Sequence, residues 1–181
     1  MQPLKRLVER IRSEQGLSRE VPDFDPLNGN ENARFLFVFE APGVKAVTTG
    51  VVSFDNPDQT AKNFKDQLRG AHIDRSEIAI WNVVPWYLGN NDKTRIRTAR
   101  NRDIVKSLAY LDSLVAILKK LECIVLVGGS ARKAHIHLSH KTGVRILSCH
   151  HPSPKVKNID PATAKENVVV FKAMKRYSRG T

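Results

Sequence analysis

Four short apolar runs, separated by segments with a helical pattern, constrain the fold of this chain more than any other feature. The runs are residues 35–39 (FLFVF), 78–84 (IAIWNVV), 123–127 (CIVLV) and 144–149 (VRILSC). They hardly alternate between apolar and polar residues. They are therefore typical of strands that are covered on both faces, as in a parallel sheet between two layers of helices.

The segments between these runs predict helices. Residues 58–69 follow Asn56-Pro57, which is a start signal for a helix, and residues 101–121 carry an apolar stripe at helical spacing. Residues 129–138 and 162–177 are two further predicted helices. The alternation predicts a single α/β domain over residues 1–181, a three-layer α/β/α sandwich with a central four-stranded, mostly parallel sheet.

In such a fold the ligand binds beyond the carboxyl ends of the strands. Asn82 stands at that edge inside an apolar run, where a buried amide must be hydrogen-bonded. Its side chain offers a donor and an acceptor to the edge of a base, although an Asn that ties down a loop backbone is the alternative. Two prolines follow His151 in the string HPSP and predict a rigid turn that presents the imidazole.

The charge of the chain favours a polyanionic partner. Thirty Lys and Arg residues against eighteen Asp and Glu give a net charge of +12, and nucleic acid is the commonest large polyanion. The run 93–102 (KTRIRTARNR) is either a grip for phosphates or a solvated entrance to a helix. No apolar run approaches the roughly 18–20 residues that span a bilayer, and the N-terminus lacks the pattern of a signal peptide. We therefore expect a cytoplasmic protein without a membrane partner, associated with the nucleoid in a prokaryote.

The cysteines and histidines do not predict a metal site. Cys123 and Cys149 are too few for the four thiolates of an iron–sulfur cluster, and both lie in apolar runs that predict buried thiols. His135 and His137 are two positions apart, so they do not share a helix face, and no HExxH or CxxC spacing occurs.

Four strings together resemble the uracil-DNA glycosylase superfamily. They are FEAPG at 39–43, Phe54, NVVPW at 82–86 and HPSP at 151–154, in the family's order and at its approximate spacing. The resemblance covers roughly residues 35–156, and FEAPG is most similar to the iron–sulfur-containing branch, whose cluster cysteines this chain lacks. It implies a monomeric DNA repair enzyme, without metal or organic cofactor, that acts on DNA containing uracil or abasic sites. Such an enzyme flips uracil out of the duplex and hydrolyses its N-glycosidic bond, leaving an abasic site.

The resemblance also implies roles for individual residues in the base pocket. Phe54 stacks on the flipped uracil, Asn82 reads its Watson–Crick edge, and His151 donates to its O2 as negative charge develops on the leaving base. Ala41 and Gly43 belong to the turn that completes the base-binding site.

The water-activating residue departs from the family's pattern. Ala41 stands where several branches carry an Asp or Asn, and residues 44–50 contain no acid. Catalysis of the water step is therefore assigned to Glu40, with Asp55 in reserve. The departure leaves open a protein that captures uracil or abasic sites with little turnover. Two more functions fit these residues: a glycosylase for hypoxanthine or xanthine, and a nucleotide-binding protein that uses residues 128–130.

Two segments near this edge are expected to contact the DNA backbone. Lys155 stands where many relatives carry an apolar wedge, so either Val156 takes that part or Lys155 holds a phosphate. We hypothesise that Lys155 and Lys157 grip the backbone. The predicted DNA-binding residues are Gly129, Ser130, Ser153, Lys155, Val156 and Lys157; the first two are alternatively a plain strand-to-helix turn.

Overall fold

The computed structural model describes residues 2–177, in which strands and helices alternate as the sequence predicts. The elements are, in chain order, α1 (Pro3–Gln15), β1 (Asp23–Phe24), η1 (Asn30–Asn32), β2 (Phe35–Phe39), α2 (Val44–Thr49), β3 (Val51–Val52), α3 (Gln59–Gly70), η2 (Arg75–Glu77), β4 (Ile78–Asn82), α4 (Asn101–Ile117), β5 (Cys123–Val127), α5 (Gly128–Arg132), α6 (His135–Lys141), β6 (Arg145–Cys149), α7 (Pro154–Ile159) and α8 (Thr163–Tyr177).

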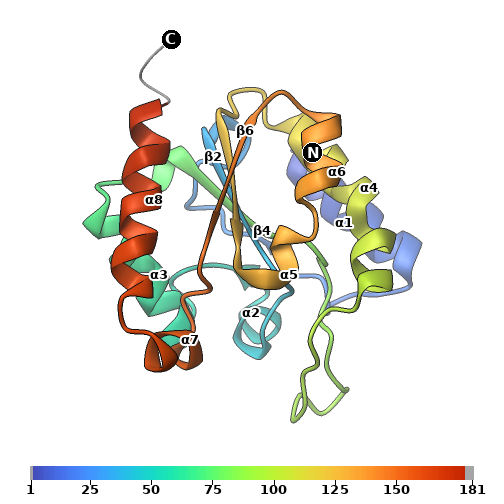
Figure 1. Ribbon diagram of the computed structural model, residues 1–181. Helices are drawn as coiled ribbons and strands as arrows, with labels where there is room; N and C mark the ends of the chain where they lie inside the picture. The colour runs from blue at the N-terminus through green and yellow to red at the C-terminus, as the bar shows by residue number, and fades with distance from the viewer. Residues whose placement is uncertain (1, 178–181) are drawn as a thin grey trace.

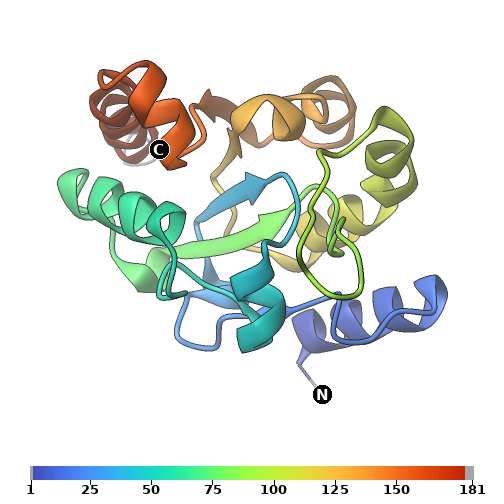
Figure 2. The same ribbon diagram turned by 90° about the horizontal axis from the view of Figure 1, so that it is seen from below.

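The central sheet contains four parallel strands in the order β4-β2-β5-β6. Helices α3 and α8 cover one face, and α1, α4 and α6 cover the other (Figures 1 and 2). Phe37 of β2 shows why the strand runs are apolar throughout. It lies opposite Ile80 and Val125 in the sheet, and its ring meets the edges of Phe64 and Phe171 from the helix layer at 5.1 and 5.0 Å. The predicted three-layer sandwich with a parallel four-stranded sheet is confirmed.

Strand β4 is shorter than predicted, because it ends at Asn82 rather than at residue 84. The next two residues still follow β2: the Val83 N–H donates to the Phe39 carbonyl at 2.8 Å and the Val84 N–H to the Glu40 carbonyl at 3.0 Å. Proline at position 85 has no N–H and cannot extend the ladder. Asn82 is therefore placed at the carboxyl end of its strand.

Three helical segments also differ from the prediction. Helix α4 ends at Ile117 because Leu118, with ψ of 79°, leaves the helical conformation. The single helix predicted over 129–138 is two helices, α5 and α6, with a break at residues 133–134. Pro154 begins helix α7 where a rigid turn was predicted. The Ser153 hydroxyl caps this helix by accepting from the Val156 N–H at 3.4 Å, and proline fits the first helical position because no donor is needed there.

The apolar pattern does not predict the two-residue strands β1 and β3, which pair in parallel beside the main sheet, or helix α2. Phe24 of β1 stacks on Trp81 of β4 with ring centroids 3.9 Å apart, so the small sheet is joined to the core. None of the helices in the described part of the chain is both long and apolar enough to cross a membrane.

Candidate base-binding site

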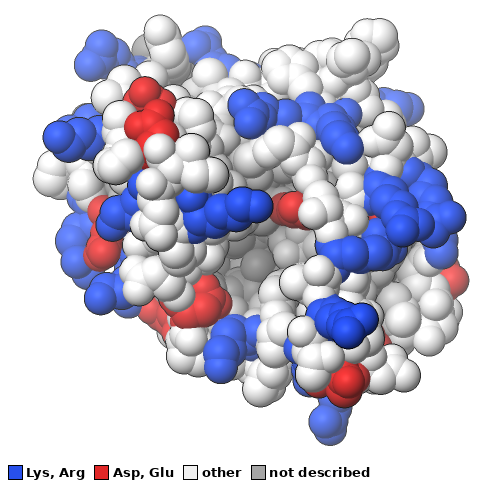
Figure 3. Space-filling model, turned by 60° about the horizontal axis from the view of Figure 1, so that its bottom comes forward, with Lys and Arg blue, Asp and Glu red and all other residues white. Residues whose placement is uncertain are grey.

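The carboxyl ends of the parallel strands surround a pocket of about 520 Å³. Its wall includes Glu40 after β2, Phe54 after β3, Asn82 at the end of β4 and His151 after β6. The predicted turn residues Ala41 and Gly43 line it as well. Figure 3 shows this edge of the molecule as a hollow bordered by many Lys and Arg side chains. Residues far apart in the sequence are thus brought to one small, partly apolar cavity.

Asn82 has the side chain in this pocket that most needs a ligand. The residue is 3% exposed, and its Nδ2 has no hydrogen-bond partner. A buried donor without a partner costs about 1–3 kcal/mol, so a fold that keeps one calls for an explanation. A ligand carbonyl in the pocket would satisfy the amide. An asparagine that ties down a loop backbone as a donor would use this Nδ2, which makes no such bond.

Glu40 holds its carboxylate at a fixed place on the pocket wall. The backbone N–H of Ala99 donates to Glu40 Oε1 at 2.5 Å, and the Glu40 carbonyl accepts from the N–H of Val84. Ala99 lies just before α4, so this contact connects the loop that precedes α4 to the end of β2. A negative charge is thereby fixed beside the pocket.

A second carboxylate on the pocket wall belongs to Asp58, which the sequence predicted only as the first residue of a helix. Its side chain caps α3 by accepting from the Ala61 N–H at 2.9 Å. Its charge acts on His151, where it raises the pKa. The signal that could have identified it is its position, four residues after Phe54 in the string FDNPD.

His151 lies against the end of the sheet in a closely packed environment. Its ring meets the Phe39 ring edge-on at 5.8 Å. Gly128, which has φ of +83°, lies so close that an added Cβ would be 3.1 Å from the His151 Cβ. Burial lowers the pKa of His151 below its ordinary value of 6.5, while the charges of Glu40 and Asp58 act in the opposite direction. The imidazole is therefore neutral near pH 7 and carries one N–H donor.

The chain on both sides of His151 is held by two buried amides. Asn167 of α8, 1% exposed, accepts from the His150 N–H at 2.8 Å and donates to the His150 carbonyl at 2.9 Å. It also donates to Gln67 Oε1 at 3.0 Å. Asn63 of α3 donates to the Pro152 carbonyl at 2.8 Å. We call Asn63 and Asn167 the amide clamp. No part of it was predicted, because its members lie 89 and 17 positions from the backbone that they hold.

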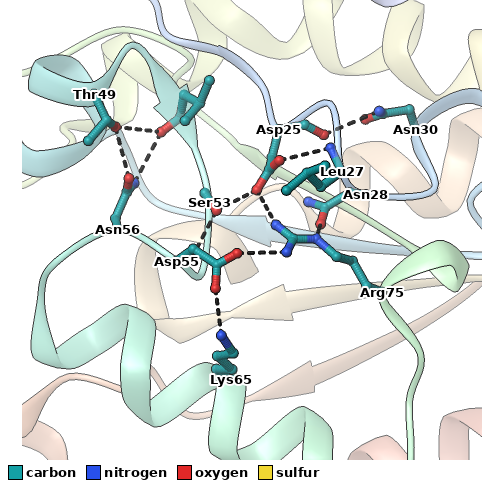
Figure 4. Close-up of polar contacts among 11 residues, drawn as sticks. Asp25, Leu27, Asn28, Asn30, Thr49, Ser53, Asp55, Asn56, Lys65 and Arg75 are labelled. Carbon is teal, nitrogen blue, oxygen red and sulfur yellow. Dashed lines mark hydrogen bonds and ion pairs between the residues drawn. The ribbon is translucent and has the colours of Figure 1, made fainter.

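Phe54 is 7% exposed and rests on a network of charged and polar side chains drawn in Figure 4. The guanidinium of Arg75 lies over the Phe54 ring, with Cζ 4.5 Å from its centroid. The nearby Lys65 Nζ is 5.6 Å from the same centroid. The ring thus lines the pocket and is supported from behind by cations.

The structure places Asp55, the reserve candidate for water activation, in that network and not on the pocket wall. Its two oxygens accept from Lys65 Nζ and from an Arg75 Nη1, each at 2.6 Å. These contacts, the bond from Lys65 first among them, lower the pKa of the Asp55 carboxyl. A carboxylate that is committed to two cations is a poor base, so these contacts weigh against Asp55 as the residue that activates water.

None of the six predicted DNA-binding residues lies on the pocket wall. Gly129 and Ser130 belong to α5, and Ser153 caps α7. Within α7, Lys155 and Lys157 are exposed and Val156 is half-buried. The lysines are thus accessible to a polyanion at the edge of the sheet, whereas Val156 is partly engaged in packing.

The basic run 93–102 supplies a pocket wall that the sequence did not assign to the site. Ile96, Arg97 and Thr98 line the cavity from the loop between β4 and α4. Arg97 donates to both oxygens of Asp103, at 2.6 and 2.9 Å, and this pairing lowers the pKa of Asp103 to about 2. Arg97 thereby holds the loop against the start of α4. The run of cations was the available signal, and its nearness to Asn82 in sequence could have connected it to the pocket.

In residues 2–177, no three His, Cys, Asp or Glu side chains are grouped so that they could hold a metal ion. His137 instead contacts Asp112 at 2.7 Å, and His150 contacts Glu166 at 2.8 Å. Cys123 and Cys149 are both buried and unpaired, and burial raises the pKa of each thiol to about 12.

The pKa of His151 provides a first test of this geometry. We expect NMR titration to give a pKa below that of a free histidine, and we expect Glu40→Gln to lower it further, because the Glu40 charge favours the imidazolium. Protonation then favours the unfolded chain. The stability linked to His151 is complete above the unfolded-state pKa and is lost as the pH falls through the folded-state pKa. A pKa that rises in Glu40→Gln would contradict this arrangement, and Glu31→Gln, in η1, is the control.

Comparisons with known proteins bear on the family and the fold. The sequence model of the family described as the Uracil DNA glycosylase superfamily matches residues 26–174. The fold is similar to the solution NMR structure of a candidate uracil DNA glycosylase from Methanosarcina acetivorans, with a TM-score of 0.56 and 13% identity, over 86% of this chain and 98% of that one. None of the curated proteins is matched by this sequence.

Proposed function

The chain belongs to the Uracil DNA glycosylase superfamily, and on that premise we propose that it removes uracil from DNA by hydrolysing the N-glycosidic bond, leaving an abasic site. The observation that carries the proposal is the buried, unpartnered Nδ2 of Asn82 in the pocket. A uracil carbonyl is the acceptor that this donor lacks, and the adjacent N3–H can donate to the amide oxygen. Phe54 and His151 on the same wall add a stacking surface and a second donor.

In the proposed reaction the nucleotide is flipped out of the duplex into the pocket. The bond between C1′ and the base nitrogen N1 breaks, and its electron pair leaves with the base. The neutral imidazole of His151 donates a hydrogen bond to O2, where part of the negative charge gathers, and does not give up its proton. A donor of this kind stabilises the departing anion more than the neutral ground state, and this difference lowers the barrier.

Glu40 has two roles in this proposal. Its carboxylate favours the positive charge that develops on the sugar as the glycosidic bond breaks, and it orients the water whose oxygen bonds to C1′. The water gives up one proton in this step, and Glu40 is the acceptor. Its contact with the Ala99 N–H keeps the carboxylate in place while the substrate enters.

We also propose that the DNA backbone crosses the hollow bordered by Lys and Arg side chains in Figure 3. Lys45 and Arg97 line the pocket, and Lys155 and Lys157 are exposed on α7. Contacts of this kind position the duplex without reading its sequence. In this proposal the protein acts as a single-domain monomer in the cytoplasm, on the nucleoid in a prokaryote.

The proposal is tested by a time course on an oligonucleotide with a single uracil, with DNA in large excess over protein and with strand breaks revealed by alkali. We expect product to rise well past one equivalent, and an otherwise identical thymine-containing duplex to stay intact. Product that stops near one equivalent would indicate a protein that captures its product. Release from hypoxanthine or xanthine duplexes, but not from uracil, would assign the pocket to another deaminated base.

A further inference from the structure

Arg75 makes more contacts than an ordinary surface ion pair, and it makes them while its guanidinium lies over the ring of Phe54. Its Nε donates to Asn28 Oδ1 at 3.0 Å, one Nη to Asp55 at 2.6 Å and the other to Asp25 at 2.5 Å (Figure 4). The plane of the guanidinium is fixed by these three partners, while Cζ lies 4.5 Å from the centroid of Phe54. Arg75 itself does not line the pocket.

The same network holds the residues on either side of Phe54. Asp25, 5% exposed, accepts from the Ser53 hydroxyl and from Arg75 on the same oxygen. Ser53 Oγ in turn accepts from the N–H of Asp55 at 3.0 Å, and the Asp55 carboxylate binds Arg75. The residue before Phe54 and the residue after it are therefore both tied to one guanidinium. Ring and backbone are fixed together.

An arginine suits this task, and a lysine does not. The guanidinium offers donors in a rigid plane, so it can bind three partners and stack on an aromatic ring at the same time. A lysine ammonium is a single point of charge on a flexible stem, and it would keep only part of these contacts. Arg75→Lys therefore keeps the charge and removes the geometry.

We propose that Arg75 is a positioning residue that holds the Phe54 ring as a preformed stacking surface for the flipped base. The inference rests on the proposed function, and it adds a residue outside the pocket that determines how strongly the protein prefers a damaged site. A ring that is already in place loses little entropy when a base stacks on it. A ring that is free to turn must be ordered in each binding event, at the expense of affinity for the base.

Arg34 provides a matched control at the opposite end of the strands. It too lies over a phenylalanine, with Cζ 5.2 Å from the centroid of Phe35, and it pairs with Glu77 at 2.9 Å and Glu122 at 2.6 Å. Phe35 is the first residue of β2, so this site lies at the amino end of the sheet. Arg34→Lys and Arg75→Lys thus make the same chemical change, one far from the pocket and one behind it.

The test measures the affinity of the protein for two duplexes, one with a non-hydrolysable uracil nucleotide and one undamaged. The proteins compared are the wild type, Arg75→Lys, Arg34→Lys, Phe54→Leu and the double variant that combines Arg75→Lys with Phe54→Leu. We expect Arg75→Lys to lower the preference for the uracil site about tenfold, which is the size of one lost base–aromatic contact. Affinity for undamaged DNA should not change, and Arg34→Lys should keep the full preference. In the Phe54→Leu background, Arg75→Lys should have little further effect, because Arg75 acts through the ring.

The inference would be overturned if Arg75→Lys and Arg34→Lys had the same preference for the uracil duplex over the undamaged duplex. It would also be overturned if Arg75→Lys still lowered this preference in the Phe54→Leu background. A loss of affinity for undamaged DNA would assign Arg75 to direct phosphate binding instead. NMR of the free protein separates failure of this inference from failure of the proposed function. If the wild type shows no preference for uracil, yet the Phe54 ring loses its fixed position in Arg75→Lys and not in Arg34→Lys, the glycosylase proposal fails and the positioning role is upheld.

Discussion

Replacing Asn82 by leucine is expected to lower the rate of uracil release by about 10²–10³-fold, because leucine can neither donate to the uracil carbonyl nor accept from its N3–H. The same change should leave the free energy of unfolding within about 1 kcal/mol of the wild type, because Nδ2 has no partner in the folded protein and leucine is of similar size. Activity and stability are thus expected to separate at this position. Alkali-revealed cleavage under saturating substrate measures the first, and urea unfolding measures the second.

The contrast with an ordinary buried amide makes the Asn82 experiment informative. If Asn82→Leu loses stability and activity together, the side chain has a structural partner and the unpartnered donor is not reserved for a base. If it keeps its full rate on uracil, the recognition role is wrong. Asn101→Ala, on the exposed first turn of α4, is the control for an asparagine outside the pocket.

Replacing Asn167 by leucine is expected, in contrast, to lower the stability of the protein. Asn167 forms three hydrogen bonds, two to the backbone of His150 and one to Gln67. Leucine would leave these partners without bonds in a tightly packed region, so we expect a loss of about 2–3 kcal/mol in the free energy of unfolding. That corresponds to a fall in Tm of roughly 4–12 °C for a chain of this size.

Activity should fall in the Asn167 variant as well, but by a different route. Loss of the amide clamp loosens the chain around His151, so the turnover number should fall while KM changes little, since Phe54 and Asn82 still bind the base. Asn63→Ala, which removes the clamp on the other side of His151, should act in the same direction and more weakly, because it breaks one backbone bond and not two. Stability unchanged in Asn167→Leu would contradict the role given to the clamp.

The main sheet could be predicted from the sequence because its strands are covered on both faces. Strands β2 and β5 are apolar at every position, β4 is apolar except for Asn82, and β6 except for Arg145 and Ser148. The predicted bounds of all four agree with the structure within two residues. The parallel arrangement then implied that Glu40, Asn82 and His151 would meet at one edge, which they do. Their chemical roles stay predictions. Proline misled in one place, because HPSP carries both the signal of a turn and that of a first helical position, and the structure uses the second.

What the sequence could not predict depends on partners that are distant along the chain. Asp55 follows Phe54 directly, but whether its carboxylate faces the pocket or the network was decided by Lys65 and Arg75, which approach from α3 and η2. The amide clamp likewise joins α3 and α8 to the segment after β6. Spacing along a sequence gives the direction of a side chain only inside regular helices and strands. Residues in the loops of this site therefore had no predictable orientation.

The unequal burial of the strands gives the two halves of the pocket unequal resistance to local unfolding. Glu40 follows β2 and Asn82 ends β4, and the side chains of these two strands are almost all buried, although β4 lies at an edge of the sheet. His151 follows β6, the strand at the other edge, whose side chains are largely half-exposed. Segments with fewer buried contacts open more often, and here the opening would carry the histidine away while the amide of Asn82 stays in place. In those moments the protein would hold a flipped base without cutting it. Local opening of β6, rather than global unfolding, would then set the fraction of molecules that are ready to react. Amide hydrogen exchange in β6 measures this opening.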